Sequence, residues 1–259
     1  ARTYIRSTPK HIGDEKMAVL IQEVVGTKKG RYFYPTISGV AKSYNFYPSG
    51  SCKAEDGIVY LALGLGKEIV DGGNSYAFCT TRPRSPLYGT AKDYMKFAQT
   101  SFYALNLHSI YNYVNYNEET SLDKLDLDAA KKHDELQHVV STYILQDDRL
   151  YPGMYDEGSY VVDFSPILNL NTIPLAKAIS LLLEISEIAL GYAVEIEFAV
   201  NIPKDETGVA ELVILQIRNM VSPQKQIKFD PSTVKDSDII LESKNIMGHG
   251  MISEISDII

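Results

Sequence analysis

Cysteine is scarce in this chain of 259 residues: only Cys52 and Cys79 occur. Two cysteines this far apart in the sequence form neither a disulfide framework nor a metal knuckle, so we expect a reducing, cytoplasmic setting. Apolar runs of the length needed to cross a bilayer, about 18 residues, are also missing, which argues against a membrane protein. Tryptophan is absent too, which by itself excludes no class of protein.

Positive charge is in deficit, with 25 Lys and Arg against 33 Asp and Glu and a net charge of -8. Without a cluster of basic residues, such a chain repels a nucleic-acid backbone, so no nucleic-acid partner is expected. The 45% of apolar residues excludes a disordered tail and supplies the core of one large domain or two small ones. Residues 1–17 contain no initiator Met and no hydrophobic signal core, and we expect the chain to begin inside a longer protein.

The first half of the chain combines short strand-like runs with turns. Residues 17–25 (MAVLIQEVV), bounded by Gly26, and residues 57–66 (GIVYLALGLG) predict buried strands. Between them, glycines and prolines around aromatic residues predict short strands and tight turns. From Thr90, which can cap a helix, apolar positions at helical spacing predict a helix that runs to residue 105.

The second half has the clearer signals. Residues 118–136 predict a solvated loop leading into a surface helix, and residues 139–145 and 158–168 predict strands. A leucine-rich stripe over 173–190, with Pro174 at its start and Gly191 at its end, predicts a helix. Residues 195–200 and 211–218 predict two strands of a hairpin with a long loop. Residues 219–259 suggest a connector toward another domain.

The hairpin carries the most informative polar residues. Side chains two apart in a strand share a face, so Glu195 and Glu197 point one way, as do Gln216 and Arg218 on the neighbouring strand. Carboxylate and amide oxygens suit Mg²⁺, and an arginine beside them suits a phosphate. Alternatively, the two glutamates lie on a solvated face and Arg218 pairs with one of them.

Two glycine-containing segments leave similar alternatives. LGLGKEIVDGG, with glycines at 64, 66, 72 and 73, can present backbone N–H groups to phosphate or can simply form turns. SGVAKSYNFYP can form a phosphate-facing turn or an ordinary hairpin. Neither segment is a P-loop or a dinucleotide-binding motif, and no GxSxG elbow occurs.

The histidines do not form a catalytic pattern. His133 and His138 fall in a charged, helix-like stretch and are interpreted as solvated. His249, between two glycines, is accessible enough for phosphorylation, but the sequence places neither a base nor an anion-binding group beside it.

Four segments in a fixed order resemble the nucleotide-binding domain of phosphoenolpyruvate synthase and pyruvate phosphate dikinase. They are MAVLIQEVVG, SGVA, LGLGKEIVDGG and the pair EIEFAV and LVILQIR, which are similar to the family's VQ-x-MV strand, SGV turn, GLGE-N-VVQG loop and DIEW and LYILQARP strands. The resemblance covers residues 14 to about 221 and is absent from roughly 80 to 165. It implies an α+β, ATP-grasp-like fold, with a largely antiparallel sheet packed with helices.

The resemblance also implies roles for particular residues. Gln22, Glu23, Val24 and Val25 correspond to the hinge strand against adenine, and Glu195 stands where the family has Asp in the nucleotide site. Glu197 and Gln216 correspond to Mg²⁺ ligands, and Arg218 to the contact with the transferred phosphate. The implied reaction uses Mg-ATP to phosphorylate a histidine on a mobile domain, from which a third domain passes the phosphoryl group to pyruvate.

Departures from the family bear on this reading. Lys67 replaces the glutamate of GLGE, and Glu68 comes one position late, which affects nucleotide affinity or specificity. The phosphate-gripping N-terminal half, the phosphohistidine domain and the pyruvate-binding domain are not recognised. Arg6 and Ser7 precede the hinge strand too closely to be the family's RSS segment.

We expect residues 1–221 to be the C-terminal portion of the ATP-grasp domain, residues 222–259 a connector, and the isolated chain to lack turnover. The alternatives are a non-catalytic nucleotide-binding or regulatory module and a dikinase for another acceptor, such as an antibiotic or a glucan.

Overall fold

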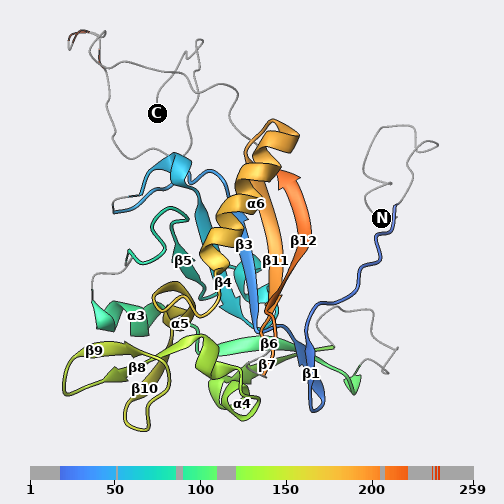
Figure 1. The fold of residues 1–259 in the computed structure, drawn as a ribbon, viewed down its shortest axis with the longest axis vertical. Coiled ribbons are helices and arrows are strands. Elements are labelled where there is room, and N and C mark those ends of the chain that lie inside the picture. The colour runs from blue at the N-terminus through green and yellow to red at the C-terminus, as the bar shows by residue number, and fades with distance from the viewer. Residues whose placement is uncertain are drawn as a thin grey trace.

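A computed structural model describes residues 18–50, 52–85, 90–109, 121–204 and 208–220, together with residues 235, 237 and 239. Within this part of the chain, strands pair antiparallel in three sheets, and helices pack against them (Figure 1). The expected α+β fold with a largely antiparallel sheet is confirmed. The described residues include no helix with both the length and the apolar character that crossing a lipid bilayer demands.

The central sheet has five strands in the order β12-β11-β3-β4-β5. Its strands are β3 (Ile37–Lys42), β4 (Ile58–Leu63), β5 (Tyr76–Phe78), β11 (Val194–Asn201) and β12 (Glu211–Asn219). β11 and β12 form the predicted hairpin, with Glu195 opposite Arg218 and Glu197 opposite Gln216. Because β3 lies on the other side of β11, segments far apart in the sequence form the middle of the sheet.

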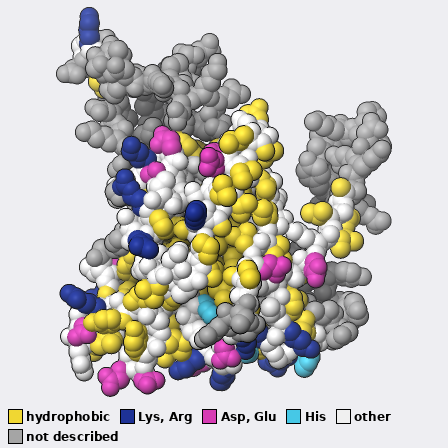
Figure 2. Space-filling view, viewed as in Figure 1, with side chains coloured by type: hydrophobic (Ala, Val, Ile, Leu, Met, Phe, Trp, Pro, Cys, Tyr) yellow, Lys and Arg dark blue, Asp and Glu magenta, His cyan; other side chains and the backbone are white. Residues whose placement is uncertain are grey.

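One face of the central sheet is buried under helix α6 (Leu175–Leu190), which lies along β11 and β3 (Figure 1). Leu175, Ile179 and Leu183 join Ile196 and Phe198 of β11 in the main hydrophobic core. The helix ends as predicted, because Gly191 adopts a left-handed conformation (φ 75°) and its N–H donates to the carbonyl of Glu187. The outer side of α6 is also apolar, as the hydrophobic side chains gathered over it in Figure 2 show.

Two smaller sheets lie below the central sheet in Figure 1. The first has the order β1-β2-β6-β7, with β1 (Thr27–Lys29), β2 (Tyr32–Tyr34), β6 (Ser101–Asn106) and β7 (Leu122–Asp126). The second has the order β10-β8-β9, with β8 (Val140–Ile144), β9 (Arg149–Pro152) and β10 (Ser159–Val162). The strands expected within 139–145 and 158–168 are present, although residues 165–168 of the latter form helix α5.

The remaining helices within the described residues are short. They are η2 (Ala54–Asp56), α2 (Lys67–Val70), α3 (Ala91–Phe97), α4 (Leu127–Lys132), η5 (Leu136–His138) and α5 (Ser165–Leu168). Thr90 caps α3 as predicted, because its hydroxyl accepts a hydrogen bond from the backbone N–H of Asp93.

Two local predictions were wrong and a third was confirmed. The helix from Thr90 ends at Phe97, and Phe102 and Leu105 belong to strand β6, because the apolar spacing spans the end of one element and the start of the next. Residues 122–126, expected to be a solvated loop, form β7 through pairing with β6. For SGVAKSYNFYP the hairpin alternative is confirmed: SGVA lies in β3, which pairs antiparallel with β4, the next strand along the chain.

The predicted buried strand at 17–25 was also wrong. Residues 18–26 have no strand pairing, and Val19, Leu20 and Ile21 are exposed by 83%, 88% and 91%. An apolar run is buried only where neighbouring elements cover it, and the described residues provide no such cover for Val19 to Ile21.

The interpretation of His133 and His138 as solvated was wrong as well. Both side chains are half-buried, and Nδ1 of His133 lies 2.8 Å from the hydroxyl oxygen of Tyr34. Burial lowers the pKa of each imidazole. His249 and the expected connector 222–259 lie outside the described residues, apart from residues 235, 237 and 239.

Candidate nucleotide-binding site

Two adjoining clefts open on the face of the central sheet opposite α6. The larger cleft, of about 550 Å³, is lined by β3, β4, β11 and β12 and by the glycine segment after α2. The smaller cleft, of about 380 Å³, lies between the residues preceding β1 and the same sheet. Glu197 lines both, so the two clefts form one continuous candidate site.

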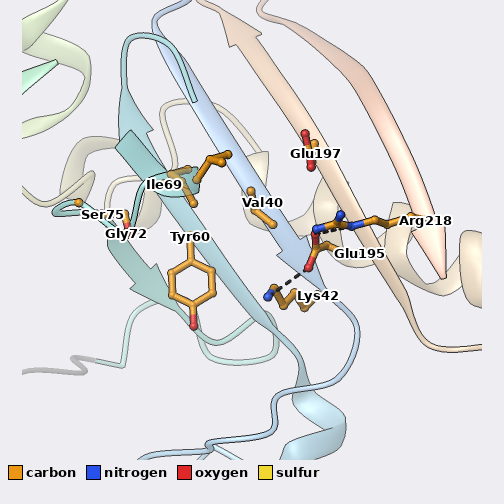
Figure 3. A pocket seen from close by; sticks show the side chains of 11 residues that line it. Val40, Lys42, Tyr60, Ile69, Gly72, Ser75, Glu195, Glu197 and Arg218 are labelled. Carbon is orange, nitrogen blue, oxygen red and sulfur yellow. Dashed lines mark hydrogen bonds and ion pairs between the residues drawn. The ribbon is translucent and has the colours of Figure 1, made fainter. Parts of the chain in front are cut away.

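Strand register arranges the polar side chains of the site in two rows across the sheet. The first row places Glu195 between Arg218 on β12 and Lys42 on β3. The second row places Glu197 between Gln216 and Val40. Because side chains alternate along a strand, both rows point away from the buried face formed by Ile196 and Phe198, as Figure 3 shows for Glu195, Glu197 and Arg218. Sequence spacing thus correctly predicted that Glu195 and Glu197 share a face beside Gln216 and Arg218.

Glu195 forms the centre of a three-charge cluster. Nε of Arg218 donates to Oε1 of Glu195 at 2.8 Å, and Nζ of Lys42 lies 3.1 Å from Oε2 (Figure 3). Burial opposes ionisation of Glu195, but Arg218 and Lys42 outweigh it and hold the pKa of this carboxyl below its usual range. The hydrogen bond to Glu195 in turn raises the pKa of Arg218. Glu195 is only 7% exposed, so it does not lie on a solvated face, although Arg218 does pair with it.

Glu197 and Gln216 provide the oxygen donors that a magnesium ion prefers. They face each other across the β11–β12 ladder, where opposite side chains lie about 5 Å apart at Cβ. Both line the smaller cleft, and Glu197 also lines the larger one. Among the described residues no group of three or more His, Cys, Asp or Glu could hold a metal by itself. One carboxylate and one amide fit Mg²⁺, which protein sites hold through few side chains together with water and phosphate oxygens.

The segment expected to contact adenine lies at the smaller cleft. Gln22, Glu23, Val24 and Val25 all line it, opposite Leu215 and Gln216 of β12. The side-chain amide of Gln22 donates to the carbonyl oxygen of Leu215 at 3.1 Å, which ties this segment to the bulge in β12. The segment therefore lies at the site without pairing as a strand of the sheet.

The glycine segment borders both clefts. Gly66 lines the smaller cleft, and Gly72 and Gly73 line the larger one. Lys67 and Glu68 line neither cleft: Nζ of Lys67 lies 2.7 Å from a carboxylate oxygen of Asp71, and buried Glu68 pairs with Lys124 at 3.5 Å. The Lys67 departure noted in the sequence thus falls on a side chain that lines neither cleft and pairs with Asp71.

Two features of the site were missed at the sequence level. Lys42 and Tyr60 line the larger cleft because β3 and β4 lie beside β11, and this pairing has no local sequence signal. Away from the site, the fold also brings the thiols of Cys52 and Cys79 together, although the two residues are far apart in the sequence. Both cysteines are free.

An antiparallel sheet with one face under a helix and the other carrying carboxylate, amide and guanidinium groups over a cleft fits the ATP-grasp-like nucleotide-binding fold that the sequence resemblance implies. The family described as pyruvate phosphate dikinase, AMP/ATP-binding domain, matches residues 1–237 of the chain. The chain belongs to this family. No curated protein sequence matches it.

Proposed function

We propose that this chain is the Mg-ATP-binding part of a phosphotransferase of the phosphoenolpyruvate synthase and pyruvate phosphate dikinase kind. The proposal rests chiefly on Glu197, which lines both clefts. It therefore connects Arg218 in the larger cleft with the segment 22–25 in the smaller one. Adenine would occupy the smaller cleft against Gln22 to Val25. The polyphosphate would extend past Glu197 toward Arg218 in the larger cleft.

Phosphoryl transfer demands placement and charge neutralisation from the protein more than covalent chemistry. Glu197 and Gln216 would hold Mg²⁺, which, when bound, neutralises charge on the phosphate oxygens. Arg218 would contact the transferred phosphate, since its side chain is 56% exposed and lines the larger cleft. Glu195 would keep that guanidinium in place through its hydrogen bonds.

The phosphoryl acceptor would be a histidine on a second domain of the same protein, and pyruvate the final acceptor at a third. The partner of this chain would be the N-terminal half of the ATP-grasp domain. The exposed apolar side chains of Val19, Leu20 and Ile21 beside the site support such a contact. Residues 1–221 would then be the C-terminal portion of that domain and residues 222–259 a connector. The cytoplasmic setting remains part of this proposal because it rests on the low number of cysteines.

The test has two stages. In the first, calorimetry measures Mg-ATP binding to the chain, and absence of binding contradicts the proposal. In the second, histidine phosphorylation by Mg-ATP is measured in the longer protein with Arg218→Ala, which should abolish transfer while leaving the fold intact. Arg149→Ala, an exposed arginine on β9 outside both clefts, serves as the matched control and should leave transfer unchanged.

The alternatives predict different results. A non-catalytic nucleotide-binding module would bind ATP but show no histidine phosphorylation in the longer protein. A dikinase for another acceptor would form the phosphohistidine but would not pass the phosphoryl group to pyruvate.

A further inference from the structure

The larger cleft contains a second cation besides Arg218. Lys42, the last residue of β3, lies directly across from Glu195 in the strand register, and its ammonium nitrogen is 3.1 Å from Oε2 of that carboxylate. Lys42 and Arg218 therefore approach the same carboxylate from opposite sides, and all three residues line the larger cleft (Figure 3).

The charges do not balance within this row. One carboxylate lies between two cations, which leaves a net charge of about +1 on this row. Glu197, which also lines the larger cleft, offsets that charge unless its carboxylate holds a cation of its own. Arg218 already satisfies Oε1 of Glu195 through its guanidinium, so neutralising the carboxylate does not require Lys42 as well. With Glu197 assigned to Mg²⁺ under the proposed function, the row presents one surplus cation to the cleft, which is a feature of sites that bind anions.

Lys42 is also able to reach an anion in the cleft. Its side chain is 34% exposed, whereas that of Glu195 is 9% exposed, so the lysine extends from the buried carboxylate toward solvent. An ammonium has three N–H donors on a flexible stem and can bind a phosphate oxygen while it keeps its contact with a carboxylate.

We propose that Lys42 is a further polyphosphate-binding residue of this site, acting beside Arg218 on the phosphates of the bound nucleotide. This inference rests on the proposed nucleotide-binding function. It assigns recognition of the polyphosphate to a row of three side chains, in which Glu195 fixes the positions of the two cations.

The test compares ligands that share adenine but differ in charge. Binding of Mg-ATP and of adenosine to the full chain is measured by calorimetry for the wild type, Lys42→Met, Lys42→Gln and Lys42→Arg. Lys42→Met and Lys42→Gln should weaken Mg-ATP binding by about tenfold, or about 1.4 kcal/mol, because a phosphate loses a charged partner. Adenosine binding should change less than about twofold, and Lys42→Arg should recover most of the ATP affinity.

Lys28→Met is the matched control, because this exposed lysine on β1 lies outside both clefts, and it should leave both affinities unchanged. Equal ATP affinity in wild type, Lys42→Met and Lys42→Gln would overturn the role of Lys42 while leaving the proposed function in place. An equal loss for ATP and adenosine would also overturn it, since that result indicates a distorted cleft. Failure of the wild type to bind either ligand would remove the proposed function and this inference with it.

Discussion

Gly39 in β3 lies directly against the ring of Phe198 in β11. A Cβ atom placed on Gly39 would lie 2.1 Å from Cζ of that ring, far inside any real contact. Phe198 is 1% exposed and belongs to the core under α6, so its ring has no room to move. The glycine of the SGV motif therefore has a packing role on the buried face of the sheet, and the residues for the candidate site lie on the other face.

Replacement of Gly39 by alanine should destabilise the protein by about 1–3 kcal/mol or more, because the added methyl group overpacks the core. Urea denaturation followed by circular dichroism measures the change in the free energy of unfolding. The double variant Gly39→Ala with Phe198→Leu should recover part of the loss, since the smaller side chain leaves space. Gly66→Ala is the control: its nearest contact would be 3.6 Å away, so little loss is expected. Unchanged stability of Gly39→Ala would contradict this packing.

Lys29 and Glu135 form a buried ion pair beneath the central sheet. Nζ of Lys29 lies 3.2 Å from Oε1 of Glu135, and each side chain is only 3% exposed. Nζ also donates to the carbonyl oxygen of Tyr34 at 3.0 Å. Burial lowers the pKa of Lys29 despite the favourable charge of Glu135, so removal of either partner leaves a charge without compensation.

Lys29→Met and Glu135→Gln should each cost about 3–5 kcal/mol of stability, measured by the same urea titration. The double variant Lys29→Met with Glu135→Leu should lose less than the sum of the two single losses. As the control, Lys204→Met breaks the exposed pair with Asp134, whose side chains are 60% and 63% exposed, and should cost less than about 1 kcal/mol. Similar losses of stability at the buried and exposed pairs would contradict the larger contribution predicted for the buried pair.

The parts of the fold that could be predicted from sequence are those with local signals. Helix α6 has its leucine stripe and Gly191, and the β11–β12 hairpin has alternating apolar residues, so Glu197 and Gln216 could be placed on one face in advance. Lys42 could not, because its position depends on pairing between strands far apart in the chain. The apolar residues 19–21 gave a strong strand signal, yet a strand needs a neighbour to pair with, and this information lies outside the segment itself.

The half-buried histidines predict a loss of stability in mild acid. The groups around His133 are Tyr34, Lys29, Glu135, Lys204 and Asp134, and His138 lies near Glu135 and Gln137. Burial lowers both histidine pKa values below the ordinary 6.5, so the unfolded chain takes up protons first as the pH falls. Stability is therefore fully present above about pH 6.5 and decreases as the pH falls toward the folded-state pKa values.

Urea titrations at pH values from about 7.5 down to about 5, in steps of about 0.5, would follow this decrease in the free energy of unfolding. The ordinary histidine pKa of about 6.5 is the reference point. The double variant His133→Gln with His138→Gln should show a shallower dependence on pH over this range. His108→Gln, at an exposed histidine, should behave like the wild type. A dependence that is the same in all three proteins would assign the acid sensitivity to other groups.

Cys52 is predicted to react slowly with alkylating agents. Burial, followed by the neighbouring thiol of Cys79, raises the pKa of Cys52 to about 11. At pH 8 its thiolate fraction is then about 0.1%, so alkylation by iodoacetamide should be roughly 100-fold slower than for a cysteine with an ordinary pKa. Mass spectrometry of the labelled peptides measures the rate. Cys79→Ser should leave Cys52 slow, because burial is the larger cause; labelling at the rate of a free cysteine peptide would show that the thiol is not protected.

Glu197→Gln should remove the magnesium dependence of nucleotide binding while preserving the shape of the clefts. The amide retains an oxygen donor but loses the charge that favours a divalent cation, so Mg²⁺ should no longer strengthen ATP binding. Without Mg²⁺, ATP should bind the variant as well as the wild type or better, because one carboxylate no longer repels the phosphates. Calorimetry with Mg²⁺ and with EDTA measures both effects. Glu211→Gln, at the far end of β12 and outside both clefts, is the control and should keep the wild-type response. If Glu197→Gln also kept the full response to Mg²⁺, the metal would have to be held elsewhere, and Glu197 would lose its role as a ligand.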